Sequence, residues 1–129
     1  PVRSALERNY AWFVWKPLDL ARIGGALPVF KGTHDFSSFC STHSESPDRI
    51  RTILNIAAER DASGMIYISV EADGFLRYMV RTIVGTLVDV GRGKRSAEEV
   101  AAILAARDRR RAGLTAPPQG LYLKDVKYQ

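Results

Sequence analysis

The longest apolar stretch of the chain, residues 75–91, has the pattern of a buried α-helix. Its apolar residues recur at three- and four-residue spacing and cover more than one face of a helix: Phe75, Leu76, Met79, Val80, Ile83, Val84, Leu87 and Val88. Arg81 interrupts this pattern, and it shares one side of the predicted helix with Arg77 and Gly85. Because an unpaired buried guanidinium is very costly, two alternatives remain: Arg81 extends to solvent, or it faces an anion in a functional site.

Two further helices are predicted on either side of the buried one. The first runs from Asp19 to about Lys31, because aspartate is a good N-cap and apolar residues follow at helical spacing: Leu20, Ile23, Leu27 and Phe30. The second opens with the capping box Ser96–Glu99 and runs to about Ala106. Between the first helix and the strands, residues 33–47 are mostly polar and predict an ordered loop.

Three strands complete the pattern. Residues 49–59 alternate, and the residues predicted to share one face are Ile50, Thr52, Leu54 and Ile56. Residues 65–72 alternate as well, with one face formed by Ile66, Ile68 and Val70. Residues 61–64, Asp-Ala-Ser-Gly, predict a hairpin turn between these strands, and residues 121–128 predict the last strand. This order of elements predicts an α+β fold, an antiparallel β-sheet with helices packed on one face.

Composition places the chain among globular proteins with a basic surface. Its 129 residues fit a single domain, 1–129, that can bury its own core. Nineteen Lys and Arg against fourteen Asp and Glu give a net charge of +5, which is compatible with a nucleic-acid partner. The lone Cys40 excludes an internal disulfide. Without a membrane-length apolar run or a secretory signal, we expect a cytoplasmic protein. Because the chain begins at Pro1 rather than at methionine, we expect a piece of a longer protein.

Two groups of reactive residues fail as catalytic or metal sites. His34, Cys40 and His43 are too few for a structural zinc site, and the chain has no second cysteine. His34, Asp35 and Ser37 include the residue types of a catalytic triad, but residues so close in sequence seldom face one another in that geometry. We therefore expect neither a metal site nor a local triad.

The segment His34–Phe39 allows a structural and a functional interpretation. In the structural one, which we favour, Phe36 and Phe39 anchor the segment in the core while His34 and Asp35 satisfy backbone groups. In the functional one, the same polar side chains form part of a site. The sequence leaves the role of this segment open.

The segment Arg107–Arg111, Arg-Asp-Arg-Arg-Arg, concentrates positive charge after the last predicted helix. Cations suit a helix C-terminus, so a solvated helix end is one interpretation. That is the usual explanation for such a segment, and contact with nucleic-acid phosphates is the alternative that the basic composition of the chain leaves open.

Several ordered motifs together resemble the C-terminal domain of the tRNA pseudouridine synthase A family. The segments that resemble it, in chain order, are Gly32-x-His34-Asp35-Phe36-Ser37-Ser38-Phe39, Phe75-Leu76-x-x-Met79-Val80-Arg81-x-Ile83-Val84-Gly85, Thr115-Ala116-Pro117 and Gly120-Leu121-x-Leu123. Asn9-Tyr10-x-Trp12 is similar to the segment that leads out of the family's first domain. The resemblance covers nearly the whole chain, and its specificity comes from the order of the motifs rather than from any one of them.

The resemblance implies an enzyme that converts uridine to pseudouridine in the tRNA anticodon stem-loop without a metal or an organic cofactor. In this family an aspartate attacks the uridine, the glycosidic bond breaks, and the base rotates and reattaches through carbon. That aspartate lies in an R-x-D-x-G-V motif of the first domain. Arg60-Asp61 differs from it because no residue separates the arginine from the aspartate. The chain thus resembles about half of an enzyme, which we expect to be inactive alone.

The resemblance assigns roles to individual residues of this half. Arg81 would pair with the nucleophilic aspartate, and Leu121 would line the uracil pocket. The expected RNA-binding residues are Arg77, Arg107, Arg109, Arg110 and Arg111. The implied partners are tRNA, the enzyme's own N-terminal catalytic domain, to which residues 1–17 would lead, and a second copy in a homodimer. The alternative is a non-catalytic RNA-binding or dimerisation module of the same fold.

Overall fold

The computed structural model describes residues 8–14, 18–40, 48–76, 78–112 and 121–125. The helices and strands in chain order are β1 (Arg8–Val14), α1 (Leu20–Phe30), β2 (Gly32–Asp35), the 3₁₀ turn η1 (Ser37–Phe39), β3 (Ile50–Arg60), β4 (Ile66–Ala72), α2 (Met79–Gly91), α3 (Ala97–Ala106), the 3₁₀ turn η2 (Arg109–Arg111) and β5 (Leu121–Asp125). None of the helices in the described part of the chain is long and apolar enough to cross a membrane.

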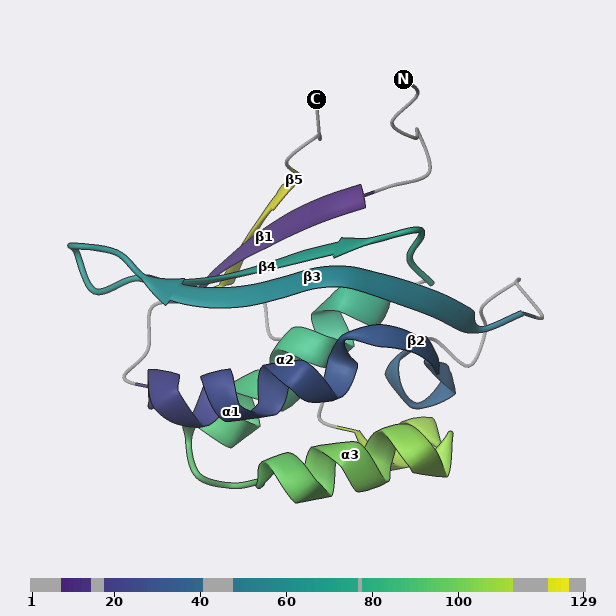
Figure 1. The fold of residues 1–129 in the computed structure, drawn as a ribbon. Coiled ribbons are helices and arrows are strands. Elements are labelled where there is room, and N and C mark those ends of the chain that lie inside the picture. The colour runs from purple at the N-terminus through teal and green to yellow at the C-terminus, as the bar shows by residue number, and fades with distance from the viewer. Residues whose placement is uncertain (1–7, 15–17, 41–47, 77, 113–120, 126–129) are drawn as a thin grey trace.

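The described strands form one antiparallel sheet in the order β2-β3-β4-β1-β5. Figure 1 shows α1, α2 and α3 together on one side of this sheet. The predicted α+β arrangement, with helices on one face of an antiparallel sheet, is confirmed.

The core lies between the sheet and α2. Along β4 every second residue is buried, and Ile66, Ile68 and Val70 have no exposed surface, as the alternating pattern predicts. From α2, Ile83 and Leu87 are equally buried and pack in the same cluster. The predicted burial of this helix on more than one face is confirmed.

Both predicted helix caps are present. The Asp19 carboxylate accepts a hydrogen bond from the Arg22 N–H at 3.1 Å and opens α1. The Ser96 hydroxyl accepts from the Glu99 N–H at 3.1 Å, and the Glu99 carboxylate accepts from the Ser96 N–H at 3.0 Å. This reciprocal capping box begins α3, and both helices end within one residue of the predicted position.

The facing of β3 differs from the prediction because the strand contains a β-bulge. Ile50 and Leu54, predicted to lie on the Ile56 face, are 53% and 40% exposed, whereas Ile53 is buried with Ile56. The register pairs Ile53 with Ala72 and then Asn55 with Glu71, so Leu54 is an extra residue without a partner on β4. A bulge reverses the alternation of a strand, and a simple alternating pattern therefore assigns the wrong face before it.

The buried helix begins later than predicted, at Met79 rather than Phe75. Tyr78 precedes it in the left-handed conformation, with φ of 62°, and the Met79 N–H donates to the Leu76 carbonyl at 3.0 Å. Leu76 is buried although it lies outside the helix, so the apolar pattern extends past the helix start. Arg77, predicted to share one side of the helix with Arg81, lies outside the described residues.

Two strands were not predicted. β1 lies between β4 and β5, and it pairs with β4 from Arg8 opposite Ala72 to Val14 opposite Ile66. β2 occupies the start of the predicted polar loop and pairs with the beginning of β3. Residues 8–14, expected to lead out of a preceding domain, are therefore also an integral part of this sheet.

Gly91, at the end of α2, gives a test of the packing between α1 and α2. A Cβ at Gly91 would lie 3.0 Å from Ile23 Cδ1 and 3.1 Å from Leu18 Cβ. We expect Gly91→Ala to lower the free energy of unfolding by about 1–3 kcal/mol, because the added methyl overpacks the core. Chemical unfolding measures this value.

Gly24→Ala is the matched control for Gly91→Ala. Gly24 is exposed within α1, and a Cβ there would meet no atom within 4 Å. Because alanine is a better helix former, this variant should gain about 0.5–1 kcal/mol. A neutral or stabilising effect of Gly91→Ala would contradict the packing described for these helices.

Candidate functional site around Arg81 and the basic segment

Arg81 lies in the first turn of α2, as the third residue of the helix. Its side chain is half-buried and its Nε atom is fully buried. The Arg81 guanidinium carbon lies 5.8 Å from the ring centre of Tyr78, which is 44% exposed. A cation at this distance from an aromatic face is stabilised by it, so Tyr78 helps to orient the guanidinium.

The surroundings of Arg81 favour an anion. The N-terminus of a helix has a partial positive charge, which is normally offset by acidic side chains in the first turn. α2 has no acidic residue in its first turn, and its N-cap residue Tyr78 makes no side-chain capping bond. Arg81 adds a full positive charge at the same position. This end of α2 is thus suited to receive a carboxylate or a phosphate.

The other residues predicted for the active site are only partly placed. Leu121 is the first residue of β5, where its register partner on β1 is Val14. Its side chain, like Arg77, lies outside what the structure describes. The role of Leu121 in a uracil pocket therefore stays a prediction.

Four of the five predicted RNA-binding arginines follow α3. Arg107 ends that helix in the left-handed conformation, and Arg109–Arg111 form η2, capped by the Asp108 carboxylate. Arg110 donates two side-chain hydrogen bonds to Asp108, at 3.1 and 3.0 Å, and hydrogen bonding from the Arg110 side chain is the main cause that lowers the pKa of Asp108. The side chains of Arg107 and Arg110 are 69% and 90% exposed. These guanidinium groups can therefore reach a ligand from solvent.

The segment His34–Phe39 has the structural role that the sequence analysis favours. Phe36 and Phe39 have no exposed surface. The His34 ring nitrogen Nε2 lies 2.9 Å from the Lys31 carbonyl, and the Asp35 carboxylate accepts hydrogen bonds from the Ser37 N–H and hydroxyl. Burial alone would raise the pKa of Asp35, but the bonds from Ser37 and nearby arginines outweigh it and lower the pKa.

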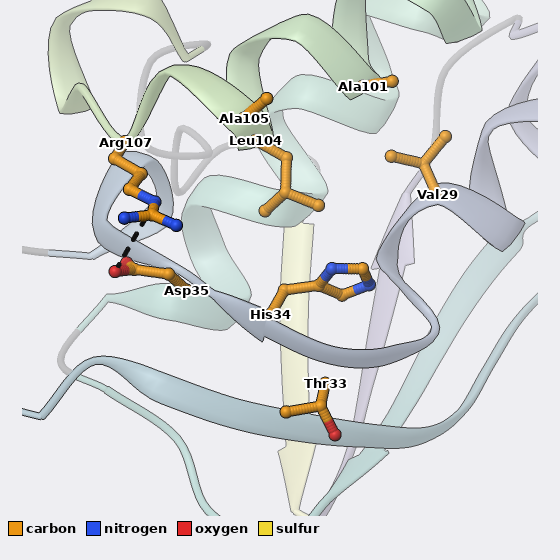
Figure 2. Close-up of a pocket in the computed structure, with 8 residues that line it drawn as sticks. All are labelled: Val29, Thr33, His34, Asp35, Ala101, Leu104, Ala105 and Arg107. Atoms are coloured by element: carbon orange, nitrogen blue, oxygen red, sulfur yellow. Dashed lines mark ion pairs between the residues drawn. The ribbon is translucent and has the colours of Figure 1, made fainter.

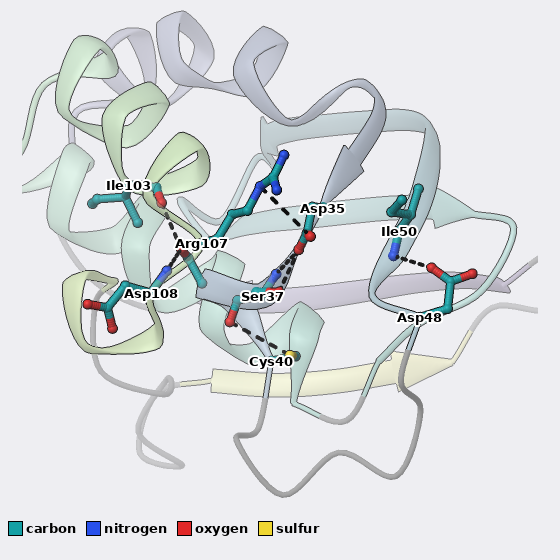
Figure 3. A network of polar contacts seen from close by, with 9 residues as sticks. Asp35, Ser37, Cys40, Asp48, Ile50, Ile103, Arg107 and Asp108 are labelled. Atoms are coloured by element: carbon teal, nitrogen blue, oxygen red, sulfur yellow. Dashed lines mark hydrogen bonds and ion pairs between the residues drawn. The ribbon is translucent and has the colours of Figure 1, made fainter.

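Ser38 is a buried polar residue that sequence reasoning missed. Its hydroxyl donates to the Ile103 carbonyl at 2.7 Å and accepts from the Asp108 N–H at 2.7 Å. Figure 3 labels both of these partners, Ile103 and Asp108. The end of α3 is thereby fixed to η1. The sequence shows only two adjacent serines between two phenylalanines, a pattern that does not identify the hydrogen-bond partners of Ser38.

A pocket of roughly 550 Å³ lies between β2 and α3 (Figure 2). Val29 and Leu104 provide apolar walls, while His34, Asp35 and Arg107 line it with polar groups. Arg107 Nε lies 3.9 Å from the Asp35 carboxylate, so the charged groups at the pocket already face each other. Arg81 does not line this pocket, which is therefore separate from the candidate active site.

The described residues contain no group of three or more His, Cys, Asp or Glu side chains that could hold a metal ion. His43 lies outside the described residues. Cys40 is buried, and burial raises the pKa of its thiol, which makes it a poor nucleophile. Among the described residues, the arginines therefore remain the candidates for a functional role.

The described residues thus form an α+β domain with a half-buried arginine at the N-terminus of a helix and an exposed basic segment, and both features suit an anionic ligand. Residues 26–129 match the family model described as tRNA pseudouridine synthase, and the chain belongs to this family.

Similar proteins agree with the family match. The chain is 53% identical to a tRNA pseudouridine synthase A of Halalkalibacterium halodurans, over 92% of this chain and 44% of that protein. It is 45% identical to one of a Geobacillus species, over 98% of this chain and 50% of the relative. A third, from Myxococcus xanthus, is 42% identical over 98% of this chain and 48% of its own length. The chain spans about half the length of these relatives.

Proposed function

We propose that this chain is the C-terminal half of a tRNA pseudouridine synthase that isomerises uridine in the anticodon stem-loop. The observation that supports this most is the family match over residues 26–129 together with the matched span of about half of each relative. The rest of the parent protein supplies the aspartate nucleophile. The isolated chain is then an incomplete enzyme.

In this proposal Arg81 is the partner of the nucleophilic aspartate. A carboxylate that attacks uridine must be ionised and held in one orientation, and a nearby guanidinium favours the ionised form. The half-buried position of Arg81 in the first turn of α2 supports this role, because the helix N-terminus adds to the positive potential. Leu121 lines the uracil pocket, where an apolar side chain excludes water from the base.

The same proposal assigns the partners of the whole protein. tRNA is the substrate, and Arg77, together with the basic segment Arg107–Arg111, contacts its backbone. The N-terminal catalytic domain completes the active site beside Arg81. We further propose that the enzyme is a homodimer and acts in the cytoplasm, where tRNA is available.

The proposal is tested with the full-length parent protein and an anticodon stem-loop RNA. We expect the parent to convert uridine to pseudouridine in this RNA, measured by separation of the nucleosides after digestion. An RNA in which every uridine of the stem-loop is replaced by cytidine is the control and should yield none. If the parent binds the first RNA but forms no pseudouridine, the alternative of a non-catalytic RNA-binding module is correct.

The basic segment should contribute to tRNA affinity without distinguishing one base sequence from another. The double variant Arg107→Gln/Arg111→Gln of the parent should bind tRNA more weakly, because two backbone contacts are lost. The slope of log affinity against log salt should become shallower by about one unit per contact. Fluorescence binding titrations across a salt series measure both quantities.

Arg92→Gln is the control for the basic segment, because Arg92 is an exposed arginine at the opposite end of α2 from Arg81. Its salt slope should equal that of the unmodified protein. An unchanged slope in the double variant would mean that Arg107 and Arg111 belong only to a solvated helix end.

A further inference from the structure

A fifth arginine, Arg49, lies close to the basic segment although it precedes β3. The Phe36 N–H donates to the Arg49 carbonyl at 2.9 Å, so the backbone of Arg49 lies directly beside the segment that leads into η1. On the other side, Ser38 in η1 accepts a hydrogen bond from the Asp108 N–H at 2.7 Å. The turn η1 therefore connects Arg49 with Arg107 and Arg109, which lie far away in the sequence.

Arg49 and Arg107 both lie near the Asp35 carboxylate, which precedes η1. Arg107 and Arg49 both lower the pKa of Asp35, in addition to its hydrogen bonds, and Arg49 and Arg109 both act on the Cys40 thiol. Arg107 Nε lies 3.9 Å from the Asp35 carboxylate. Asp35 pairs with Ile50, the residue after Arg49, across β2 and β3, so basic residues from two separate segments lie near one carboxylate.

This group of arginines lies at the end of the molecule where α2 begins. Ala72, the last residue of β4, pairs with Ile53 near the start of β3, and the chain then enters α2. In Figure 1 the start of β3, the segment after β2 and the end of α3 lie together at the right. A nucleic-acid backbone bound there would lie on the same end of the domain as Arg81.

We infer that Arg49, Arg107 and Arg109 form one phosphate-binding surface, the η1 basic cluster, and that its ligand is the tRNA sugar-phosphate backbone. The inference rests on the proposed function, and it adds Arg49 to the residues that the sequence identifies. Asp35 lies within this cluster and competes with the phosphate for the same guanidinium groups. Since exposed ion pairs are weak, a phosphate can replace that carboxylate as a partner.

The first test replaces Arg49 in the full-length parent with glutamine. Arg49→Gln should make the slope of log tRNA affinity against log salt shallower by about one unit. Arg49→Lys should restore the slope, because the charge is retained. The Arg49 backbone carbonyl, which accepts from Phe36, is kept in both variants.

Arg22→Gln is the matched control for Arg49→Gln. Arg22 is exposed on α1, and its guanidinium carbon lies 4.0 Å from where a Cβ of Gly93 would be, beyond the C-terminal end of α2. It is thus an arginine at the other end of the buried helix, and its replacement should leave the salt slope unchanged.

The second test uses a substitution that should strengthen tRNA binding rather than weaken it. Asp35→Asn removes a negative charge from the cluster but keeps a side-chain oxygen that accepts from the Ser37 N–H. This variant should bind tRNA more tightly at low salt, by up to about fivefold, since an ion pair near the surface is worth up to about 1 kcal/mol.

The outcomes separate this inference from the proposed function. If the parent forms pseudouridine but the Arg49→Gln slope equals that of the unmodified protein, the inference is wrong and the proposed function stands. Weaker or unchanged binding by Asp35→Asn would contradict the competition between Asp35 and phosphate. If the parent forms no pseudouridine in tRNA, the proposed function is wrong, whatever salt slope the Arg49→Gln variant shows.

Discussion

Replacing Arg81 with alanine in the full-length parent should slow the conversion of bound uridine by about 100-fold or more while tRNA affinity changes little. The effect is of the size seen when one preorganised electrostatic partner is removed from an active site. Arg81 is half-buried at the start of α2, and its guanidinium carbon lies 5.8 Å from the centre of the Tyr78 ring, so this side chain is positioned for a site rather than extended freely into solvent. Single-turnover kinetics with saturating tRNA separate the chemical rate from binding.

Two variants control this experiment. Arg81→Lys keeps the charge but loses the planar two-pronged geometry of a guanidinium, so its rate should lie between those of the alanine variant and the unmodified enzyme. Arg92→Ala removes an exposed arginine just after the same helix and should leave the rate unchanged. An unchanged single-turnover rate in Arg81→Ala would contradict the proposed partnership with the nucleophile.

The isolated chain should fold but form no pseudouridine. Folding is expected because the sheet and α2 enclose a continuous apolar core. Activity is not expected because the proposed nucleophile belongs to the N-terminal catalytic domain. Three aspartates of this half that could be considered instead, Asp35, Asp61 and Asp73, already have structural roles. The Asp35 carboxylate binds Ser37, that of Asp61 accepts hydrogen bonds within the hairpin turn, and that of Asp73 accepts from the Thr52 N–H at 3.0 Å.

Thermal unfolding followed by circular dichroism measures the first part of this prediction, and nucleoside analysis of incubated tRNA measures the second. The unfolding transition should be cooperative, and the pseudouridine yield should equal that of a protein-free control. Turnover by the isolated chain would make Asp35, Asp61 or Asp73 the nucleophile. Three single Asp→Asn variants of the chain would then identify which one.

Local patterns predicted those parts of the fold that depend on neighbours in sequence. The N-cap Asp19 and the capping box Ser96–Glu99 are satisfied within a few residues, so their sequence signal is sufficient. The regular alternation of β4 reflects burial on one face and is visible in the sequence.

Features that depend on tertiary packing were not predictable in the same way. The extra residue Leu54 is defined by the register against β4, which the sequence of β3 alone does not contain. Leu76 is buried before α2 starts, so burial and helix formation do not coincide there. Strand β1 is recognised by its pairing with β4 and β5 rather than by its own pattern.

The residues of the candidate site also divide into those that the sequence identifies and those that only the structure identifies. Arg81 stands out in the sequence because a charge interrupts an apolar helix, and the resemblance of the surrounding motif assigns its role. Ser38 and Arg49 do not stand out, because their importance comes from contacts with residues far along the chain, Asp108 and Phe36. Side chains that join distant segments require the structure.

The most direct test of the account is the pH dependence of the single-turnover rate in the full-length parent with and without Arg81. A guanidinium beside a carboxylate lowers the pKa of that carboxylate, so removing it should raise the pKa of the nucleophile. The rate should therefore fall at a higher pH in Arg81→Ala than in the unmodified enzyme as the solution is acidified. We expect a shift of about one to three pH units in this acid limb. Acid limbs that coincide in the two proteins would contradict the claim that Arg81 keeps the nucleophile ionised.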